Sequence, residues 1–211
     1  MMESKRNKPC FYIESKADVT ELMAVRPKLR KILGVRITTN AFYIRTLGLA
    51  ARRFPLVMGR IDGDSIRFAD EINVGFAVNA PQGLIVPVVK NAERKTLPQI
   101  AREEKLLTDK ARDNKLKLED IEGETIALSN LGAYSIDSFI GIVPPPVSTI
   151  LAVGNVVPSV VYREGEITIR KLLCVSLAVD RRIISEIYAA RFLDFIKQHL
   201  QNPQQLIHCS Q

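Results

Sequence analysis

Stretches with two different spacings of apolar residues follow one another along the chain. The order of these stretches is the feature that most constrains the fold. Some stretches repeat apolar residues every three to four positions, as in a helix with one buried face, and others have the two-residue spacing or β-branched composition of strands. The helices are expected at about 18–33, 39–54, 97–111 and 185–200. The strands are expected at 72–78, 84–89, 124–128, 149–153, 160–169 and 172–179, with the 160–169 segment a hairpin that turns at Glu164-Gly165.

This order lacks the regular strand–helix–strand repeat of a doubly wound sheet. We therefore expect a two-layer α/β fold in which a mixed sheet carries its helices mainly on one face. Asp18 and Glu21 fit a capping box that starts the first helix, and Pro27 should kink or split that helix because it lacks an amide hydrogen. No repeat or flexible linker interrupts the sequence, so one domain over residues 1–211 is the simplest organisation.

Several classes of protein and partner are disfavoured. No apolar stretch reaches the roughly 18 residues of a membrane span, and no secretory signal is visible at the start. The three cysteines, Cys10, Cys174 and Cys209, form neither a disulfide framework nor a metal pattern, which favours a reducing, cytoplasmic location without a bound metal.

The net charge of +7 favours anionic partners. The densest charged run, residues 90–117, mixes nine basic with five acidic residues and has no aromatic side chain on which a base could stack. This run is better explained as a solvated helix face than as a nucleic-acid surface.

Six short segments occur in a fixed order. They are residues 72–78 (INVGFAV), 83–89 (GLIVPVV), 128–132 (LSNLG), 145–146 (PP), 150–154 (ILAVG) and 189–193 (AARFL). Together they resemble the catalytic domain of the dihydrolipoamide acyltransferases, the core component of 2-oxoacid dehydrogenase complexes. The likeness runs from about residue 11 to residue 200. No lipoyl domain, lipoyl attachment site or peripheral-subunit-binding domain is recognised in the chain.

The resemblance implies a chloramphenicol-acetyltransferase-like fold assembled as trimers, often built into cages. Each active site of the family lies between two subunits, in a channel that coenzyme A and the lipoyl arm enter from opposite sides. The family moves an acyl group between the thiols of dihydrolipoamide and coenzyme A. A histidine abstracts the thiol proton, and the serine equivalent to Ser129 stabilises the oxyanion from the neighbouring subunit.

The sequence departs from the family at its proton-accepting group. The family motif Asp-His-Arg-x-x-Asp-Gly reads here as residues 180–186, in which the histidine is Arg181, the second aspartate is Ser185 and the glycine is Glu186. An arginine stays protonated and cannot act as a general base. Losing a positioned base costs typically ~10²–10⁴ in rate. Ser129 is retained, so half of the site is expected to survive.

Three functions are compatible with this pattern. The first is a catalytically impaired family member, a pseudoenzyme that acts as a structural or regulatory subunit and can lend Ser129 to an active neighbour. The second is a working coenzyme-A-dependent acyltransferase in which Arg181 holds a thiolate and Ser129 the oxyanion. The third is a binding module for coenzyme A or another anionic ligand.

Purely structural roles are equally open for the site residues. Ser129 can be a strand-end hydroxyl, Ser185 a helix N-cap, and Arg181 an ion-pair partner of Glu186 or of an acid on another subunit.

Four other positions bear on the site. His199 and His208 are expected to be surface residues of the last helix and tail. Cys10 stands where many relatives have a histidine and is expected to be a small buried residue. Met58 stands where the family often has an asparagine that faces the substrate.

Overall fold

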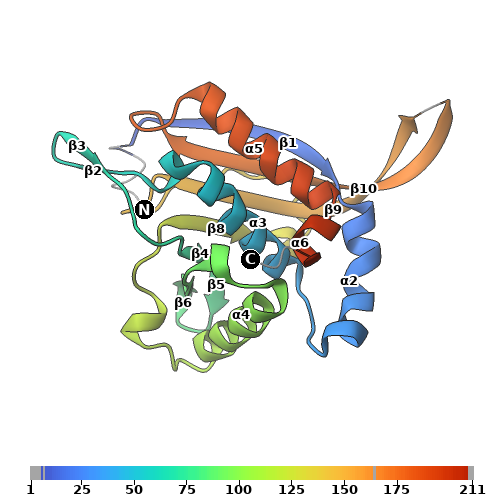
Figure 1. Cartoon of the computed structure of the whole chain (residues 1–211), viewed down its shortest axis with the longest axis horizontal. Helices are drawn as coiled ribbons and strands as arrows, with labels where there is room; N and C mark the ends of the chain where they lie inside the picture. Colours follow the sequence, from blue (N-terminus) through green and yellow to red (C-terminus); the bar gives the residue numbers. More distant parts are fainter. Residues whose placement is uncertain (1–5, 7, 164, 209–211) are drawn as a thin grey trace.

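The protein is described by a computed structural model that covers residue 6, residues 8–163 and residues 165–208 (Figure 1). Its centre is a six-stranded sheet with the order β1-β10-β9-β8-β4-β7. The strand β8 runs parallel to β4 and β9, and the other neighbouring pairs are antiparallel, so the sheet is mixed as expected. These strands are β1 (Cys10–Asp18), β4 (Val74–Phe76), β7 (Val88–Val89), β8 (Ile126–Asn130), β9 (Thr149–Arg163) and β10 (Glu166–Asp180).

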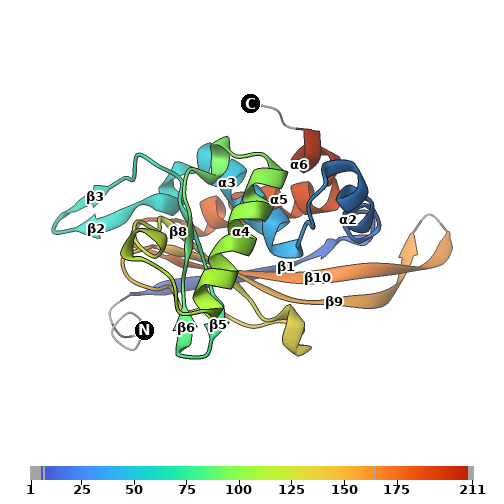
Figure 2. The same ribbon diagram turned by 90° about the horizontal axis from the view of Figure 1, so that it is seen from below.

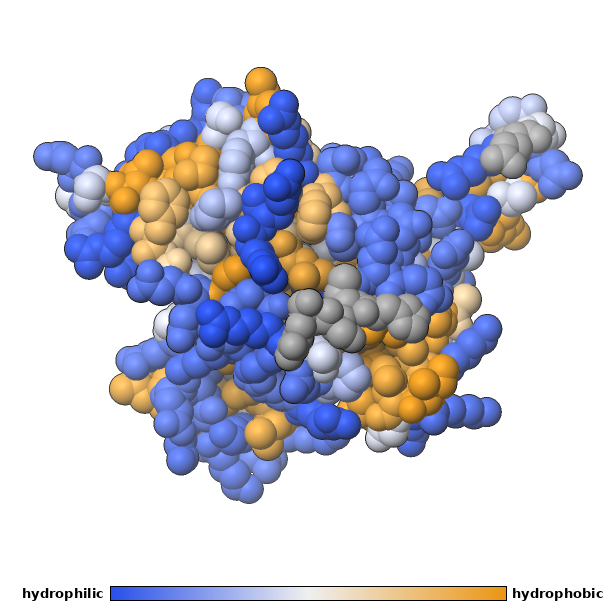
Figure 3. All heavy atoms as spheres, in the orientation of Figure 1, coloured by the Kyte–Doolittle hydropathy of each residue, from blue (hydrophilic) through white to orange (hydrophobic). Residues whose placement is uncertain are grey.

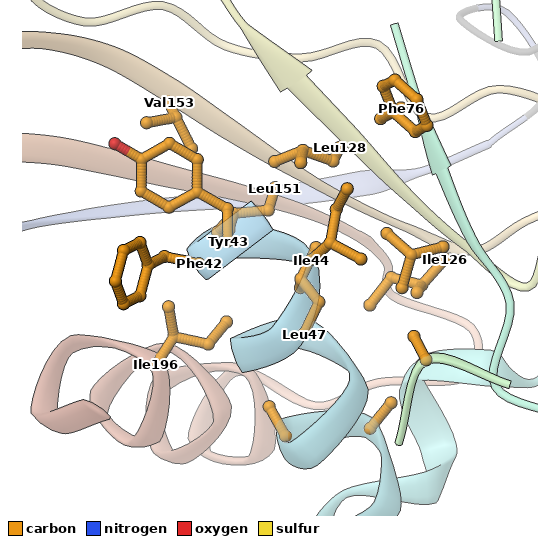
Figure 4. Packing of buried hydrophobic residues seen from close by; sticks show 14 of the residues in the cluster. Phe42, Tyr43, Ile44, Leu47, Phe76, Ile126, Leu128, Leu151, Val153 and Ile196 are labelled. Atoms are coloured by element: carbon orange, nitrogen blue, oxygen red, sulfur yellow. The ribbon is translucent and has the colours of Figure 1, made fainter. Parts of the chain in front are cut away.

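The long helices pack on one face of this sheet, which confirms the two-layer α/β fold (Figure 2). They are α2 (Thr20–Leu33), α3 (Thr39–Arg53), α4 (Leu97–Arg112) and α5 (Glu186–Gln201), followed by the short α6 (Gln204–His208). Helix α3 is buried on nearly every side. Figure 4 shows its side chains Phe42, Ile44 and Leu47 between those of the sheet and Ile196 of α5.

Two small hairpins stand apart from the main sheet. They are formed by β2 (Arg60–Asp62) with β3 (Ser65–Arg67), and by β5 (Val78–Ala80) with β6 (Gly83–Ile85). The predicted strands 72–78 and 84–89 are therefore each divided between the main sheet and the second hairpin. The division places Val74 and Phe76 in the core and leaves Leu84 exposed.

The opposite face of the sheet is covered in part by the segment 131–147. Val143 and Val147 of this segment pack with Ala127, Ile150 and Ala178 in a second, smaller core. The segment passes so close to β9 that a Cβ atom on Gly154 would lie 2.0 Å from the carbonyl oxygen of Asp137. A larger residue at that glycine would push the covering segment off the sheet.

The strands β9 and β10 form one long hairpin whose end projects beyond the helices, at the right of Figure 1. We call residues 158–163 and 165–171 the arm. One side of the arm carries four apolar residues in two directly opposed pairs. They are Val160 (72% exposed) opposite Ile169 (73%), and Tyr162 (73%) opposite Ile167 (75%).

The apolar side of the arm continues the side of the sheet that faces the helices. Val156 and Leu173, which lie on this side where the arm begins, pack against the main core. The core-facing side of the sheet therefore extends past the helices that cover it. Hydrophobic side chains are visible on the arm among hydrophilic ones in Figure 3. In the described part of the chain, no helix has the length and apolar character to cross a membrane.

Candidate functional site

The motif segment 180–186 connects the end of β10 to the start of α5. Asp180 is buried, and its carboxylate accepts hydrogen bonds from Nε and Nη2 of Arg182, at 2.9 and 2.6 Å, and from the Arg182 amide at 3.1 Å. Burial alone would raise the pKa of Asp180, but the bonds from Arg182 outweigh it and hold that pKa below its usual value. The charged fork between Asp180 and Arg182 fixes the backbone on both sides of Arg181.

The side chain of Arg181 forms an ion pair with Glu186, with 2.6 Å between Nη2 and Oε1. Both side chains are about half exposed, and the Arg181 amide donates to the carbonyl of Pro9 at 3.0 Å. Ser185 is the N-cap of α5, and its hydroxyl accepts a hydrogen bond from the Tyr188 amide at 3.4 Å. The structural roles considered for Arg181 and Ser185 are therefore both present in the molecule.

Ser129 lies near the end of β8, well away from Arg181. Its register partner on β9 is Ala152, which in turn pairs with Ser176 of β10. Arg181 is five residues beyond Ser176, so the two Cα atoms are separated by about 17 Å along the strands and about 10 Å across them. Ser129 and Arg181 of one chain are thus about 20 Å apart and cannot act on the same atom.

The residue after Ser129 lines a cavity of about 500 Å³, which we call the Asn130 cavity. Its walls come from α2, from the start of α3, from the turn after β8 and from the base of the arm. Arg26 and Lys171 are its two cationic lining residues. Tyr43 at its wall is buried, which raises the pKa of its hydroxyl to about 12 and keeps it neutral.

A larger cavity of about 860 Å³ lies on the side of the sheet near the motif segment, and we call it the Glu124 cavity. Met58 lines it, with the segment 144–147 and several acidic residues. Burial raises the pKa of Glu124 to about 7, although the positive charge of Lys8 opposes the shift. The ammonium of Lys8 lies within 3.2 Å of the Pro144 carbonyl oxygen and also donates to that of Val147.

Four further positions singled out in the sequence are His199, His208, Cys10 and Met58. His199 stacks on Phe195 with 4.0 Å between ring centroids, and it lies about 20 Å along α5 from the helix start, too far to replace the base. The side chain of His208 is outside the described residues. Cys10, expected to be a small buried residue, is half-buried against the smaller core, and Met58 is buried.

Sequence reasoning missed one buried acid, Glu104. The charged run 90–117, which includes Glu104, is expected to be a solvated face, but Glu104 is only 6% exposed. The signal was present, because Glu104 lies three to four residues from Ile100, Ala101 and Leu107, which all point to the core. The solvated face is confirmed for the exposed pair of Lys105 and Asp109.

The architecture defines the class of protein. A chloramphenicol acetyltransferase superposes with a TM-score of 0.60 at 17% identity, covering 92% of this chain and 89% of that chain, which shows a shared fold alone. A dihydrolipoamide acetyltransferase of Azotobacter vinelandii superposes with a TM-score of 0.92 at 29% identity, covering 98% of this chain and 87% of that one. The chain therefore has the chloramphenicol-acetyltransferase-like fold of an acyltransferase core.

The family follows from the sequence comparison. The model of the 2-oxoacid dehydrogenases acyltransferase family (catalytic domain) matches residues 1–208, and the chain belongs to this family.

Two curated relatives illustrate the likeness. The acetyltransferase component of the pyruvate dehydrogenase complex of Rickettsia conorii is 33% identical over 207 residues, 96% of this chain and 50% of the relative. The pyruvate dehydrogenase protein X component of Mus musculus is 33% identical over 211 residues, 98% of this chain and 42% of the relative. The chain thus spans about half the length of the curated relatives it matches.

Proposed function

We propose that this protein is a core subunit of a 2-oxoacid dehydrogenase complex whose own acyl transfer is impaired. The observation that carries the proposal is the ion pair between Arg181 and Glu186 at the position of the family's catalytic base. A thiol with a pKa near ~8.5 needs a base to become a nucleophile at neutral pH, and a guanidinium cannot accept its proton. The lost rate of ~10²–10⁴ corresponds to about 3–5 kcal/mol of barrier.

The same ion pair weakens the alternative in which Arg181 holds a thiolate. Glu186 already neutralises the guanidinium at 2.6 Å, so an incoming thiolate would have to displace a carboxylate. The exposed position of the pair reduces the electrostatic attraction further, because water screens it.

Assembly is supported by the geometry of the retained half of the site. Ser129 is about 20 Å from Arg181 in its own chain, so an active site that uses both positions requires a second chain. The arm supports the same conclusion. Its exposed apolar side continues the helix-facing side of the sheet, and a surface of this kind is typical of a contact with another subunit. We propose a trimer in which copies of this chain, or this chain and active subunits, share their sites.

Relatives fit this role. The protein X component is named as part of pyruvate dehydrogenase, and a solved relative is described as the cubic core of the pyruvate dehydrogenase multienzyme complex. Catalysis in the dihydrolipoamide acetyltransferase of Azotobacter vinelandii was investigated through a serine, a histidine and an asparagine. Of these types, the present chain offers the serine and lacks the histidine at the aligned motif. A cytoplasmic location remains part of the proposal.

The ligand of the Asn130 cavity is proposed to be coenzyme A. The cavity adjoins Ser129, and Arg26 and Lys171 provide positive charge suited to phosphate groups. Calorimetric titration of the protein with coenzyme A tests this assignment. Binding that Arg26→Ala does not weaken would place the ligand elsewhere.

The decisive experiment measures acyl transfer from acetyl-coenzyme A to dihydrolipoamide. We expect the wild type and Arg181→Ala to be equally slow, and Arg181→His with Ser185→Asp and Glu186→Gly to be at least ~100-fold faster, since a base is restored. Light scattering on each variant controls for assembly. A wild-type rate equal to that of the restored variant contradicts the proposal, and a lower rate for Arg181→Ala supports the thiolate-holding alternative.

A further inference from the structure

One carboxylate at the end of strand β1 is connected to the arm in two ways. It belongs to Asp18, the last residue of β1, whose side chain is only 14% exposed. A carboxylate that is largely removed from water costs free energy unless polar partners surround it. The partners of Asp18 lie at the start of α2 and on the arm.

The first connection runs through Thr20 to the backbone of the arm. Oδ1 of Asp18 accepts hydrogen bonds from the Thr20 amide at 3.1 Å and from the Thr20 hydroxyl at 2.6 Å. The hydroxyl that donates to Asp18 still has lone pairs, and its oxygen accepts the Lys171 amide at 2.8 Å. The Lys171 carbonyl in turn accepts the Val19 amide at 2.8 Å. Both backbone polar groups of Lys171 are therefore held.

This connection reaches the wall of the Asn130 cavity. Lys171 and its register partner Pro158 form the base of the arm, and both line that cavity. Lys171 also provides one of the two positive charges there. Asp18 thus acts on the cavity wall through Thr20.

The second connection consists of two ion pairs. Oδ2 of Asp18 lies 3.6 Å from Nη1 of Arg163, at the end of β9, and 3.8 Å from Nε of Arg170, on β10. Arg163 pairs with Glu166, which is six residues along β10 from Leu172, the partner of Asp18. In a straight hairpin this offset would be about 20 Å, which is more than the two side chains can span. The arm is therefore bent, and Figure 2 shows its end turned toward the helices.

The two arginines lie on the polar side of the arm. Side chains alternate along a strand, so Arg163 and Arg170 point away from the side that carries Tyr162 and Ile169. Nε of Arg170 is buried and has no hydrogen-bond partner in the described part of the chain, so the nearby charge of Asp18 offsets its burial. Asp18 thus holds one side of the arm and leaves the apolar side outward.

We infer that Asp18 is the positioning residue of the arm. It holds the base of the arm at the wall of the Asn130 cavity, and it directs the apolar side outward, toward a second copy of this chain. The second copy as the partner rests on the proposed function, in which Ser129 and Arg181 of one chain cannot share a site. The positioning within one chain does not depend on that proposal.

Three variants separate this role from a role in starting α2. Asp18→Ala removes both connections. Asp18→Asn keeps an oxygen that can accept from Thr20 and loses the charge that attracts the two arginines. Glu21→Ala removes a carboxylate from the same first turn of α2 and is the matched control, since Glu21 is exposed and forms no ion pair with the arm in the described residues.

The first readout is hydrogen exchange at the Lys171 amide by NMR, compared with the Ile13 amide in the middle of the β1–β10 pair. We expect about five- to tenfold faster exchange at Lys171 in Asp18→Ala, the size expected for loss of one hydrogen bond, and no change at Ile13. Asp18→Asn and Glu21→Ala should exchange as the wild type does. Unchanged exchange at Lys171 in Asp18→Ala, or an equal rise at Ile13, would overturn the inference.

The second readout is light scattering over a dilution series. The concentration at which half of the assembly dissociates should rise about threefold in Asp18→Asn, the size expected for loss of partly exposed ion pairs, and stay unchanged in Glu21→Ala. Arg163→Gln with Arg170→Gln should have the same effect as Asp18→Asn, and all three changes together should add nothing further.

The two readouts fail in different ways. Equal dissociation of Asp18→Asn and the wild type would overturn the role of Asp18 toward the second copy and leave it as a residue that starts α2. A wild type that is monomeric at every concentration would show that the proposed assembly is wrong, and exchange at Lys171 alone then decides the positioning.

Discussion

Ser185 shows how a residue at a catalytic position can serve the fold. Its hydroxyl caps α5 through the Tyr188 amide. We expect Ser185→Ala to lower the free energy of unfolding by about 1 kcal/mol, because alanine offers no acceptor, and Ser185→Asp to be close to neutral. Urea denaturation measures both. A loss in Ser185→Asp as large as in Ser185→Ala would contradict the capping role.

Glu124 is the residue whose charge should make stability depend on pH near neutrality. Its pKa is raised from 4.5 to about 7 by burial, so the folded protein binds this proton more tightly than the unfolded chain. Stability is then highest below pH 4.5 on this account and falls as the pH rises toward 7, where the folded carboxyl ionises.

The variant Glu124→Gln removes that penalty. We expect it to be about 1–3 kcal/mol more stable than the wild type at pH 8 and to differ little at pH 5. Denaturant unfolding of both proteins at the two pH values gives the comparison. A difference that does not change with pH would show that Glu124 is not the titrating group.

At the scale of elements, the helices were the most predictable part of the fold. The segments 39–54, 97–111 and 185–200 correspond to α3, α4 and α5, because each has a long apolar period and a clear start. The predicted split at Pro27 is wrong, since α2 is one helix from Thr20 to Leu33, and the alternative, a kink at Pro27, stays a prediction. Pro27 is exposed, so water can satisfy the carbonyl that its ring leaves without a partner. The N-cap position of this helix is Val19 rather than Asp18, but the Asp18 carboxylate accepts the amide of Thr20, the first helical residue, at 3.1 Å as expected.

The strands were harder to predict, because the bounds of a strand depend on which other strand it pairs with. The segments 149–153, 160–169 and 172–179 are parts of one hairpin, and Pro158, which suggests a break, is accommodated opposite Lys171. The expected turn falls between the ends of β9 and β10, with residue 164 outside the described part. The strand β1 was missed, since its long-range pairing with β10 is not visible in local spacing. The single-domain organisation over 1–211 stays a prediction.

The candidate site was predictable only where its residues lie close together in one sequence motif. The Arg181–Glu186 pair and the Ser185 cap lie within six residues of each other in sequence and were both considered. The hydrogen bond between Asn130 of β8 and Asn40 of α3 joins two separate elements and depends on tertiary packing, so no spacing in the sequence indicates it.

The arm should control assembly. Replacing both Ile167 and Ile169 with lysine places two charges on its apolar side, and we expect the assembly to dissociate to monomers with little change in the melting temperature. Glu166→Lys, an exposed change next to the same turn, is the control and should leave the assembly intact. Light scattering reports the mass. An unchanged mass in the double variant would show that the arm is not an interface.

At the scale of the whole molecule, the 20 Å separation of Ser129 and Arg181 predicts complementation between chains. A chain with Ser129→Ala and the restored motif (Arg181→His, Ser185→Asp, Glu186→Gly) has a base and no oxyanion donor, whereas the wild type has the reverse. Each is expected to be slow alone. Co-expressed, they should form mixed assemblies at least ~10-fold more active than either, since one oxyanion donor contributes ~10²–10³.

That experiment has a strict control. The same mixture with Ser129→Ala also present in the second chain should show no gain. Equal activity in the two mixtures would mean that Ser129 does not serve the site of another subunit.

The fork of Asp180 and Arg182 bears on how this protein lost its proposed activity. The two residues that flank the altered position still hold its backbone in place, with the carboxylate buried and the guanidinium on it. The backbone at position 181 is therefore firmly held, although the residue there is an arginine. Under the proposed function, activity was lost by replacement of a few side chains rather than by loss of the fold. Reversing those few replacements is therefore expected to restore an active enzyme.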